Sequence, residues 1–326
     1  MPSTTTPLNI VFLDGRTLNP GDLTWDAFEA LGHFTVYEES TEADVVNRAA
    51  KADVLILNKT PLRRRHIERL PRLRLVCVAA TGYDVVDIAA AREHGIPVCN
   101  SAGYGTHAVA QMALAHLLEV TNRVGHYAEA DRQGFWSRSK DFCCWNAPLT
   151  ELCGKRAATV GYGHIGRAVL DLFRPLGMKL SAVTSKRPDE LPADVSPLTL
   201  DEAFATCDVV TLNCPLTPDN RGFVNAELLG KARRGLILIN TARGRLVDEE
   251  AVAAALREGR LAAYGADVLA QEPPRPDNPL LSAPNANITP HIAWATPEAR
   301  NRIIAIIAKT IRTFQAGRRL DNVVNN

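Results

Sequence analysis

Gly161-Tyr162-Gly163-His164-Ile165-Gly166 lies halfway along the chain. The apolar run Arg156–Val160 ends at its first glycine and predicts a buried strand, and an amphipathic pattern over Ile165–Leu176 predicts a helix. In that setting the glycines permit a tight turn, close approach of a pyrophosphate to the backbone, and close packing of helix on strand. The phosphates would face unpaired N–H groups of the first helical turn. We therefore expect a dinucleotide site rather than an ordinary glycine turn, with contacts from Gly161, Gly163, His164, Ile165 and Gly166.

Strand and helix patterns alternate on both sides of this turn. The expected strands of the first half are Leu8–Leu13, Phe34–Tyr37, Asp53–Leu57, Leu73–Ala80 and Ile96–Asn100, with helical patterns at Trp25–Leu31, Glu42–Ala50, Arg63–Leu70 and Val85–His94. Those of the second half lie near Ala157–Val160, Lys179–Val183, Val209–Asn213, Leu236–Asn240, Ala262–Ala266 and Asn287–Thr289. Longer helices are expected over His107–Arg132 and Pro297–Gln315. The alternation predicts an α/β protein with two doubly wound parallel-sheet (Rossmann/flavodoxin-like) domains and an interdomain cleft.

The dinucleotide turn falls in the second sheet, so substrate binding is the default role of the first. We expect a dinucleotide-binding domain over residues 104–297 and a discontinuous substrate-binding domain made of residues 1–103 and 298–326. Met1–Pro7 is expected to be a short leader without regular structure. Gly134–Leu149, which is polar and aromatic with paired cysteines, is expected to extend over the surface or onto a partner subunit.

Composition narrows the class of protein. An apolar content of 46% with 22% charged residues is normal for a soluble globular chain. A formal charge of +1 gives no reason to expect nucleic acid or an anionic membrane as a partner. No signal segment or bilayer-length apolar run is present, and seven cysteines without a framework or metal-binding spacing favour a cytoplasmic protein with free thiols and no metal.

The end of the second strand after the turn indicates which dinucleotide binds. An acid is usual there, about 18–20 residues past the third glycine, where it accepts hydrogen bonds from the adenosine ribose. This chain has Thr184, Ser185, Lys186 and Arg187 instead. Cations and hydroxyls suit a 2′-phosphate, so NADP(H) is favoured and NAD(H) is the alternative. A solvated basic turn is the competing interpretation.

Polar residues follow three apolar strands of the second half, where ligands bind in open α/β sheets. They are Arg243 after Leu236–Asn240, Asp267 and Glu272 after Ala262–Ala266, and His291 after the last strand. Reduction of a 2-oxo acid needs a cation that polarises the carbonyl, and a proton donor suited to neutral pH. A carboxylate beside an imidazole orients it and favours its charged form. Arg243, His291 and Glu272 fit these roles.

The chain resembles the D-2-hydroxyacid dehydrogenase family from about residue 40 to 320. The matching pieces are 80-ATGYDVVD-87, the glycine turn, 213-NCPLT-217, 240-NTARG-244, 267-DVLAQEP-273 and Pro290-His291. The resemblance implies that Arg243 binds and polarises substrate, Glu272 supports His291, and His291 transfers the proton. It implies cofactor contacts from Thr106, Cys214, Pro215, Thr241, Ala242 and Asp267, and substrate contacts from the Thr81 and Gly82 backbone. A homodimer is expected as well.

Finer matches around Trp136–Cys143 and His291–Thr296 resemble the glycerate dehydrogenase/hydroxypyruvate reductase branch, with Trp294 as a substrate contact or a structural aromatic. Asn213 departs from the family, since many relatives have His there, and Thr184 departs by lacking the ribose acid. The expected activity is NADPH-dependent reduction of hydroxypyruvate or glyoxylate to the D-2-hydroxy acid. Alternatives are reduction of pyruvate or a bulkier 2-oxo acid, and a dinucleotide-sensing binding protein like the transcriptional corepressors that share this fold.

Overall fold

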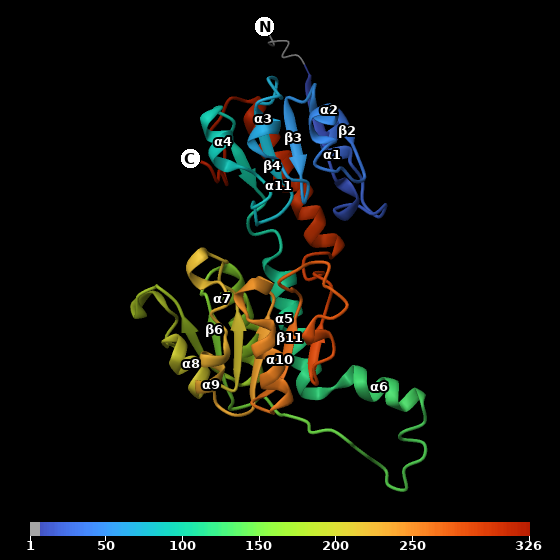
Figure 1. Ribbon diagram of the computed structural model, residues 1–326, viewed down its shortest axis with the longest axis vertical. Helices are drawn as coiled ribbons and strands as arrows, with labels where there is room; N and C mark the ends of the chain where they lie inside the picture. The colour runs from blue at the N-terminus through green and yellow to red at the C-terminus, as the bar shows by residue number, and fades with distance from the viewer. Residues whose placement is uncertain (1–6) are drawn as a thin grey trace. The chain divides into compact units, whose positions relative to one another are not determined.

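The computed structural model describes residues 7–326, so the leader expected over Met1–Pro7 lies outside the described residues apart from Pro7. The chain divides into two compact units (Figure 1). One contains the residues up to Gly105 together with Trp294–Asn326, and the other is Thr106–Ala293. The boundaries expected from sequence fall a few residues from these.

The first unit is built on a five-stranded parallel sheet with the order β2-β1-β3-β4-β5, the flavodoxin-like order. Its strands are β1 (Leu8–Phe12), β2 (Gly32–Val36), β3 (Val54–Leu57), β4 (Leu75–Val78) and β5 (Val98–Asn100). Its helices are α1 (Asp26–Glu29), α2 (Val45–Ala49), α3 (Arg64–Ile67), α4 (Ile88–Glu93) and α11 (Pro297–Gln315). Helix α11 packs against β4 and α1, so the last helix of the chain covers the first sheet.

The second unit is built on a seven-stranded parallel sheet with the order β12-β11-β10-β9-β6-β7-β8. Its strands are β6 (Arg156–Val160), β7 (Lys179–Val183), β8 (Val195–Pro197), β9 (Val209–Leu212), β10 (Leu236–Asn240), β11 (Leu261–Ala266) and β12 (Ala286–Ile288). The strand order reverses between β6 and β9, the Rossmann pattern, and a dinucleotide binds at such a reversal. The sequence predicted every one of these strands except β8.

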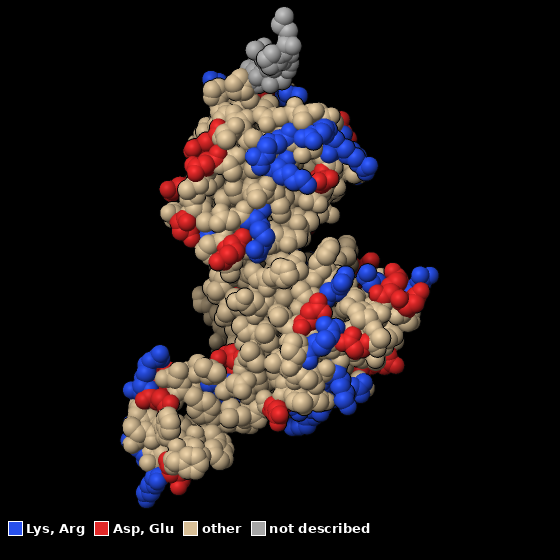
Figure 2. Space-filling view, turned by 180° about the vertical axis from the view of Figure 1, so that it is seen from behind, with Lys and Arg blue, Asp and Glu red and all other residues tan. Residues whose placement is uncertain are grey.

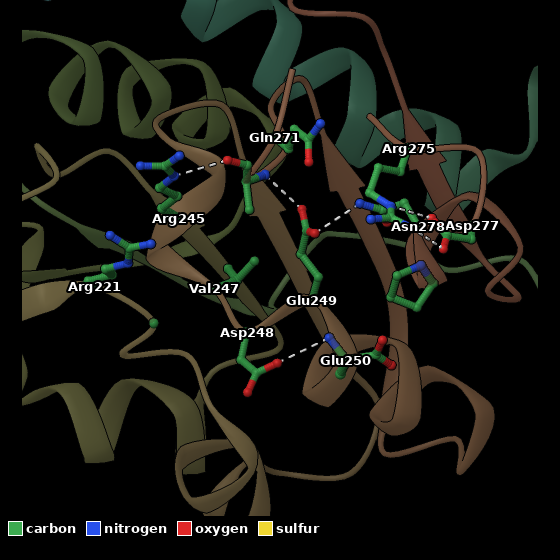
Figure 3. A pocket seen from close by; sticks show the side chains of 13 residues that line it. Arg221, Arg245, Val247, Asp248, Glu249, Glu250, Gln271, Arg275, Asp277 and Asn278 are labelled. Carbon is green, nitrogen blue, oxygen red and sulfur yellow. Dashed lines mark hydrogen bonds and ion pairs between the residues drawn. The ribbon is translucent and has the colours of Figure 1, made fainter. Parts of the chain in front are cut away.

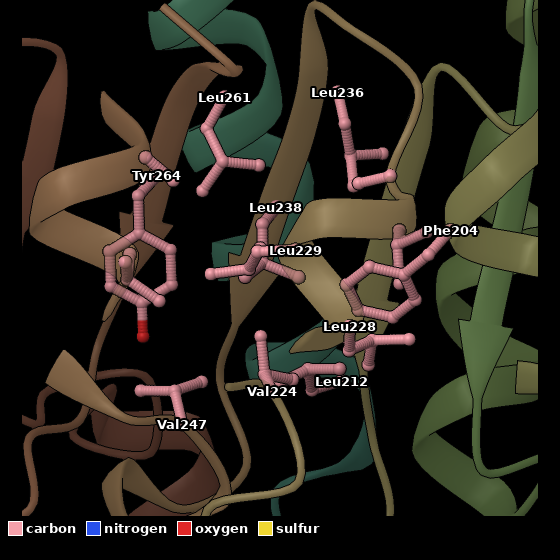
Figure 4. Close-up of a cluster of buried hydrophobic side chains, with 14 of the residues drawn as sticks. Phe204, Leu212, Val224, Leu228, Leu229, Leu236, Leu238, Val247, Leu261 and Tyr264 are labelled. Carbon is pink, nitrogen blue, oxygen red and sulfur yellow. The ribbon is translucent and has the colours of Figure 1, made fainter. Parts of the chain in front are cut away.

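Helices cover both faces of the second sheet. They are α5 (Thr106–Asn122), α7 (His164–Phe173), α8 (Leu200–Thr206), α9 (Ala226–Lys231) and α10 (Glu249–Arg257), whereas α6 (Val124–Arg132) buries no residue. Helices α8, α9 and α10 bury Phe204, Leu229 and Leu256 against one face, where Leu238 and Tyr264 are fully buried (Figure 4). Helices α5 and α7 cover the other face. With both faces covered, the central strands β9 and β10 are buried along their whole length.

The single helix expected over His107–Arg132 is wrong, because the chain breaks at Arg123. That residue has φ +53°, which ends α5, and α6 starts at the next residue. Hydrogen bonds hold the break: the Arg123 guanidinium donates to the carbonyl of Pro148 and to Asn285, and Glu119 accepts from the Gly125 N–H. Glu119 thereby satisfies an N–H of the new helix that has no partner within it.

The segment from α6 to the start of β6 extends from the second unit (Figure 1). We call residues 124–149 the arm. The arm exposes large apolar side chains, with Phe142 90% and Trp145 70% exposed. Figure 2 shows uncharged surface on the visible face of the arm, with charged side chains of both signs at its margins. None of the helices within residues 7–326 is long and apolar enough to cross a membrane.

Candidate functional site

The glycine turn joins β6 to α7, and each of its three glycines has a separate physical reason. Gly161 has φ +97°, and a Cβ there would lie 2.7 Å from the Cys214 nitrogen. A Cβ on Gly166 would lie 2.0 Å from the Gly161 carbonyl oxygen, so this glycine lets the helix approach the turn. A Cβ on Gly163 would meet no protein atom within 4 Å, so protein packing does not explain that glycine. Close approach of a ligand to the backbone does.

Two further features fit a dinucleotide at this turn. Gly163 is the N-cap of α7 and no side chain caps that helix, so its first N–H groups are available to phosphate, with His164 exposed and Ile165 half-buried. The buried Asn213 Oδ1 and Thr241 Oγ1 have no hydrogen-bond partner among the described residues. These atoms follow β9 and β10, and buried polar atoms usually have partners. A bound dinucleotide would supply them.

The remaining residues expected to contact the cofactor lie at the same edge of the sheet. Cys214 and Pro215 follow β9 directly, and the Cys214 backbone is the close neighbour of Gly161. Thr241 and Ala242 follow β10 and are half-buried. Thr106 begins α5. The carboxyl ends of neighbouring parallel strands thus bring these segments together.

At the end of β7, Thr184 is half-buried, and Ser185, Lys186 and Arg187 are exposed. Arg187 forms ion pairs with Asp189 at 3.3 Å and with Glu190 at 3.6 Å. The Lys186 ammonium forms no ion pair with any residue of 7–326, and its backbone N–H donates to Thr184 Oγ1. A 2′-phosphate here would meet Lys186 without a competing carboxylate, whereas it would share Arg187 with two acids.

Arg243 is presented by a turn that Asn240 holds. The Asn240 Oδ1 accepts the Ala242 N–H at 3.1 Å, and its Nδ2 donates to the Arg243 carbonyl at 3.0 Å. Asn240 is fully buried and its Nδ2 also lies 3.3 Å from the Tyr264 hydroxyl, which ties the turn to the core. The sequence analysis missed this role. An Asn closing an apolar strand before small residues was the available signal, because Asn favours such turns.

His291 and Glu272 form a direct pair. The His291 Nδ1 and the Glu272 Oε2 are 2.6 Å apart, and their side chains are 32% and 37% exposed. The other Glu272 oxygen accepts the Leu269 N–H at 2.9 Å, which fixes the carboxylate. With Nδ1 committed to Glu272, a proton exchanged with a ligand would pass through Nε2.

The loop of Arg243 and the loop of Glu272 are in contact. A Cβ on Gly244 would lie 1.9 Å from the Leu269 carbonyl carbon, so only glycine permits this approach. Strands β10, β11 and β12 are neighbours in the sheet, and the loops after them carry Arg243, Glu272 and His291 respectively. The structure therefore brings all three residues to one edge of the second sheet.

Asp267 has a set of protein partners that the sequence analysis did not predict. Asp267 is 1% exposed. Oδ1 accepts from the Thr289 hydroxyl at 2.5 Å and the Ile292 N–H at 2.9 Å, and Oδ2 accepts from the Ala293 N–H at 2.7 Å. All three contacts lie in the segment around His291. The contact to the nicotinamide expected from the sequence stays a prediction.

The three expected substrate contacts outside this loop cluster belong to the first unit. Thr81 and Gly82 follow β4, with the Thr81 carbonyl accepting from Asn100 Nδ2 at 2.7 Å. Trp294 is half-buried at the start of the segment that leads into α11. Within its own unit, the Thr81–Gly82 loop lies at the carboxyl edge of a doubly wound sheet, which is where such sheets bind ligands.

A cavity of about 750 Å³ lies beside the loops that follow β10 and β11 (Figure 3). Arg243, Glu272 and His291 do not line it. At its wall the Ala270 peptide is held from both sides. Its N–H donates to Glu249 Oε1 at 2.7 Å, and its carbonyl accepts from Arg245 Nε at 3.0 Å. Glu249 Oε2 also accepts from Asn278 at 2.9 Å. Sequence reasoning missed these residues, which fix the chain just before Glu272.

Comparisons with known proteins agree with this geometry. Residues 114–293 match the model of the D-isomer specific 2-hydroxyacid dehydrogenase, NAD binding domain. The chain is 44% identical over 322 residues to a hydroxypyruvate reductase of Blautia hydrogenotrophica, covering 98% of this chain and 100% of that protein. It is 38% identical to a glycerate dehydrogenase of Methylorubrum extorquens, covering 95% and 96% of the two chains. The chain belongs to the D-isomer specific 2-hydroxyacid dehydrogenase family.

The family assigns a nicotinamide dinucleotide as cofactor and small 2-hydroxy or 2-oxo acids as substrates, so this member is an NAD(P)-dependent oxidoreductase acting on a CH–OH group. Among solved structures, the chain is similar to an acyclic imino acid reductase in complex with NADPH and D-Arg. That similarity has a TM-score of 0.84 and 27% identity, and covers 97% of this chain and 100% of the other.

Proposed function

We propose that this dehydrogenase reduces hydroxypyruvate to the D-2-hydroxy acid, or glyoxylate to the achiral 2-hydroxy acid, with NADPH favoured as the reductant. The observation that carries the proposal is the 2.6 Å contact between His291 Nδ1 and Glu272 Oε2 at the sheet edge that also presents Arg243. Relatives named hydroxypyruvate reductase, glycerate dehydrogenase and glyoxylate reductase support the substrate class.

The proposed roles follow from the chemistry of each side chain. When bound, the nicotinamide supplies a hydride to the substrate C2. The Arg243 guanidinium binds the substrate carboxylate and polarises the C2 carbonyl, as a planar fork of donors can. The His291 Nε2 gives its proton to the carbonyl oxygen as that oxygen gains charge. Glu272 holds the imidazole through Nδ1 and stabilises its charged form until the proton leaves. The product is the 2-hydroxy acid, with His291 neutral.

The proposed domain roles follow from the same assignments. The second unit, with the glycine turn, would bind the dinucleotide through the turn residues and the segments after β7, β9 and β10. The first unit would contribute the backbone N–H groups of Thr81 and Gly82 to the substrate carboxylate, and Trp294 to one side of a small substrate. Asp267 would contact the nicotinamide only through carboxylate lone pairs that do not already accept from Thr289, Ile292 and Ala293.

The test is an absorbance assay of NADPH and NADH consumption with hydroxypyruvate, glyoxylate, pyruvate and a bulky 2-oxo acid. We expect the highest kcat/KM with hydroxypyruvate or glyoxylate and NADPH. A preference for pyruvate or the bulky acid would contradict the substrate proposal but not the family. Binding of NADPH without turnover of any 2-oxo acid would contradict the enzyme proposal and favour a dinucleotide-sensing protein.

The preference for NADPH depends on the end of β7. Lys186→Ala should raise the KM for NADPH about tenfold and the KM for NADH less than about twofold, because only NADPH carries the phosphate that the ammonium would bind. Lys179→Ala is the control, since Lys179 is an exposed cation at the opposite end of β7. Equal losses for both coenzymes in Lys186→Ala would restore the solvated-turn interpretation.

The exposed apolar arm and the family together support a homodimer, which we propose as the functional state. All seven cysteines are free thiols, three of them buried, and this supports a reducing compartment such as the cytoplasm.

A further inference from the structure

A buried histidine outside the proposed catalytic group is connected by hydrogen bonds to the segment that carries His291. His116 lies on α5 and is 4% exposed. Its Nε2 lies 3.1 Å from Thr289 Oγ1. A histidine buried in a helix face loses its hydration, and a partner must replace it. Leu or Ala would fill this position in an ordinary apolar face, so the choice of a polar ring calls for an explanation.

The direction of this hydrogen bond is fixed by the next one. The Thr289 hydroxyl has a single proton and lies 2.5 Å from Asp267 Oδ1. An ionised carboxylate only accepts, so the hydroxyl proton points to Asp267 and the His116 Nε2–H must donate to the hydroxyl. Burial lowers the pKa of His116, with the Asp267 charge opposing that shift. The imidazole is therefore neutral near neutral pH, with its proton on Nε2.

The row of hydrogen bonds ends at the residues that follow His291. Asp267 accepts the N–H groups of Ile292 and Ala293, at 2.9 and 2.7 Å. His291 itself has φ +55°, a backbone conformation that side-chain-bearing residues adopt at a cost. Such a conformation persists only when the surrounding structure holds it. The contacts of Asp267 supply that restraint on one side, and α5 supports Asp267 through Thr289.

Strand β11 is shaped to receive the imidazole. A Cβ on Gly265 would lie 2.8 Å from His116 Cβ and 3.1 Å from its Cγ. Gly265 lies on β11 two residues before Asp267, which directly follows the strand, so one segment both admits His116 and carries the carboxylate that His116 supports. This observation is independent of the hydrogen bonds and points to the same placement of the ring.

We infer that His116 is a positioning residue for His291, acting through Thr289 and Asp267. The inference rests on the proposed function of His291 as proton donor. His116 orders the 289–293 segment so that the His291 ring keeps its contact with Glu272 and its Nε2 faces substrate. Its removal should slow the proton-transfer step and leave binding of substrate and dinucleotide nearly unchanged.

The first experiment compares His116→Leu with His116→Gln. Glutamine can donate a hydrogen bond near the position of Nε2, whereas leucine has similar bulk and no donor. We expect kcat to fall about tenfold in His116→Leu with both KM values within about twofold of wild type, and kcat to recover to within about threefold in His116→Gln. Thr121→Val is the matched control: Thr121 is a buried polar residue on α5 whose hydroxyl donates to the Leu117 carbonyl of the same helix.

The second experiment asks whether His116 acts through Thr289. Thr289→Val removes the hydroxyl and Thr289→Ser retains it, so the pair also serves if His116→Leu fails to fold. In the Thr289→Val background, His116→Leu should change kcat by less than about twofold, because the row is already broken. If the two substitutions lowered kcat independently, so that their fold-losses multiplied in the double variant, the inference would be overturned. A wild-type kcat in His116→Leu would overturn it as well, and so would an equal loss of kcat in His116→Leu and His116→Gln.

Amide hydrogen exchange supplies a readout that does not need turnover. The amides of Ile292 and Ala293 should exchange about tenfold faster in His116→Leu and Thr289→Val than in wild type, and at the wild-type rate in His116→Gln, Thr289→Ser and Thr121→Val. Unchanged exchange in both broken variants would overturn the inference whatever the substrate. A wild-type enzyme inactive on every 2-oxo acid, with exchange changed as expected, would instead contradict only the proposed function.

Discussion

Arg243 is the residue on which substrate binding and carbonyl polarisation are both proposed to depend. Its backbone is set by the buried Asn240, so replacing the side chain should leave the turn intact. Arg243→Ala should lower kcat/KM by more than about 100-fold, about 3 kcal/mol or more of transition-state stabilisation, because one guanidinium serves both roles. Steady-state kinetics with the preferred 2-oxo acid measures this loss.

A conservative variant and a control variant accompany that measurement. Arg243→Lys keeps the charge and loses the planar fork, and should recover only part of the activity. Arg257→Ala removes an exposed cation at the end of α10 and should leave kcat/KM unchanged. A wild-type kcat/KM in Arg243→Ala would remove Arg243 from the proposed mechanism.

At the same scale, the sequence predicted the proposed catalytic residues because each follows an apolar strand and has side-chain chemistry suited to one step. The internal contacts of Asp267 could not be predicted in this way. They depend on the backbone of Ile292 and Ala293 turning toward the carboxylate after a residue with φ +55°. Histidine adopts positive φ more often than most residues, but that preference is too weak to predict the conformation at one position. The pairing of His116 with Thr289 likewise joins residues 173 positions apart.

Among the elements, the loop that carries Glu272 depends on the start of α10. Glu249 accepts the Ala270 N–H and the Asn278 side-chain N–H with its two carboxylate oxygens (Figure 3). Glu249→Ala should lower the free energy of unfolding by about 1–3 kcal/mol, because it leaves these donors without a partner. The kcat should fall as well, since the Glu272 segment loses its restraint. Urea unfolding and steady-state kinetics measure the two effects.

The neighbouring acid provides the control. Glu250→Ala removes an exposed carboxylate from the same helix turn. It should change the free energy of unfolding by no more than about 0.5 kcal/mol and should leave kcat unchanged. A stable, fully active Glu249→Ala would show that the Ala270 peptide is held sufficiently by Arg245 alone.

Element boundaries show where sequence patterns stop being informative. Strand β8 has three residues, of which only Val195 is buried, and it ends in proline, so it lacks both the length and the alternation of a recognisable strand. The break between α5 and α6 falls on Arg123, with neither Gly nor Pro to mark it. Its causes are contacts to Pro148 and Asn285, which lie far along the chain.

Whole-molecule stability should depend on pH through His116. Burial lowers the pKa of this imidazole below its ordinary value of 6.5. The native state then binds fewer protons than the unfolded chain, so the free energy of unfolding falls as the pH drops below 6.5 and levels off once the folded-state pKa is passed. His116→Gln cannot titrate, so it should lose less stability than wild type between about pH 8 and pH 5. Urea titrations at both pH values test this, and parallel losses would contradict it.

Assembly is the last property that the fold implies at this scale. The arm exposes Phe142 and Trp145 in a segment whose own contacts are mostly local, and contiguous exposed apolar side chains mark interaction surfaces. A second copy of the chain is the proposed partner, so wild type should sediment as a dimer at micromolar concentration. Phe142→Glu combined with Trp145→Glu should shift it to monomer, because two buried charges without partners oppose association. Lys140→Glu alters charge in the same arm without removing an apolar contact, and should remain dimeric. A monomeric wild type, or an unaltered dimer in the double variant, would assign the arm another role.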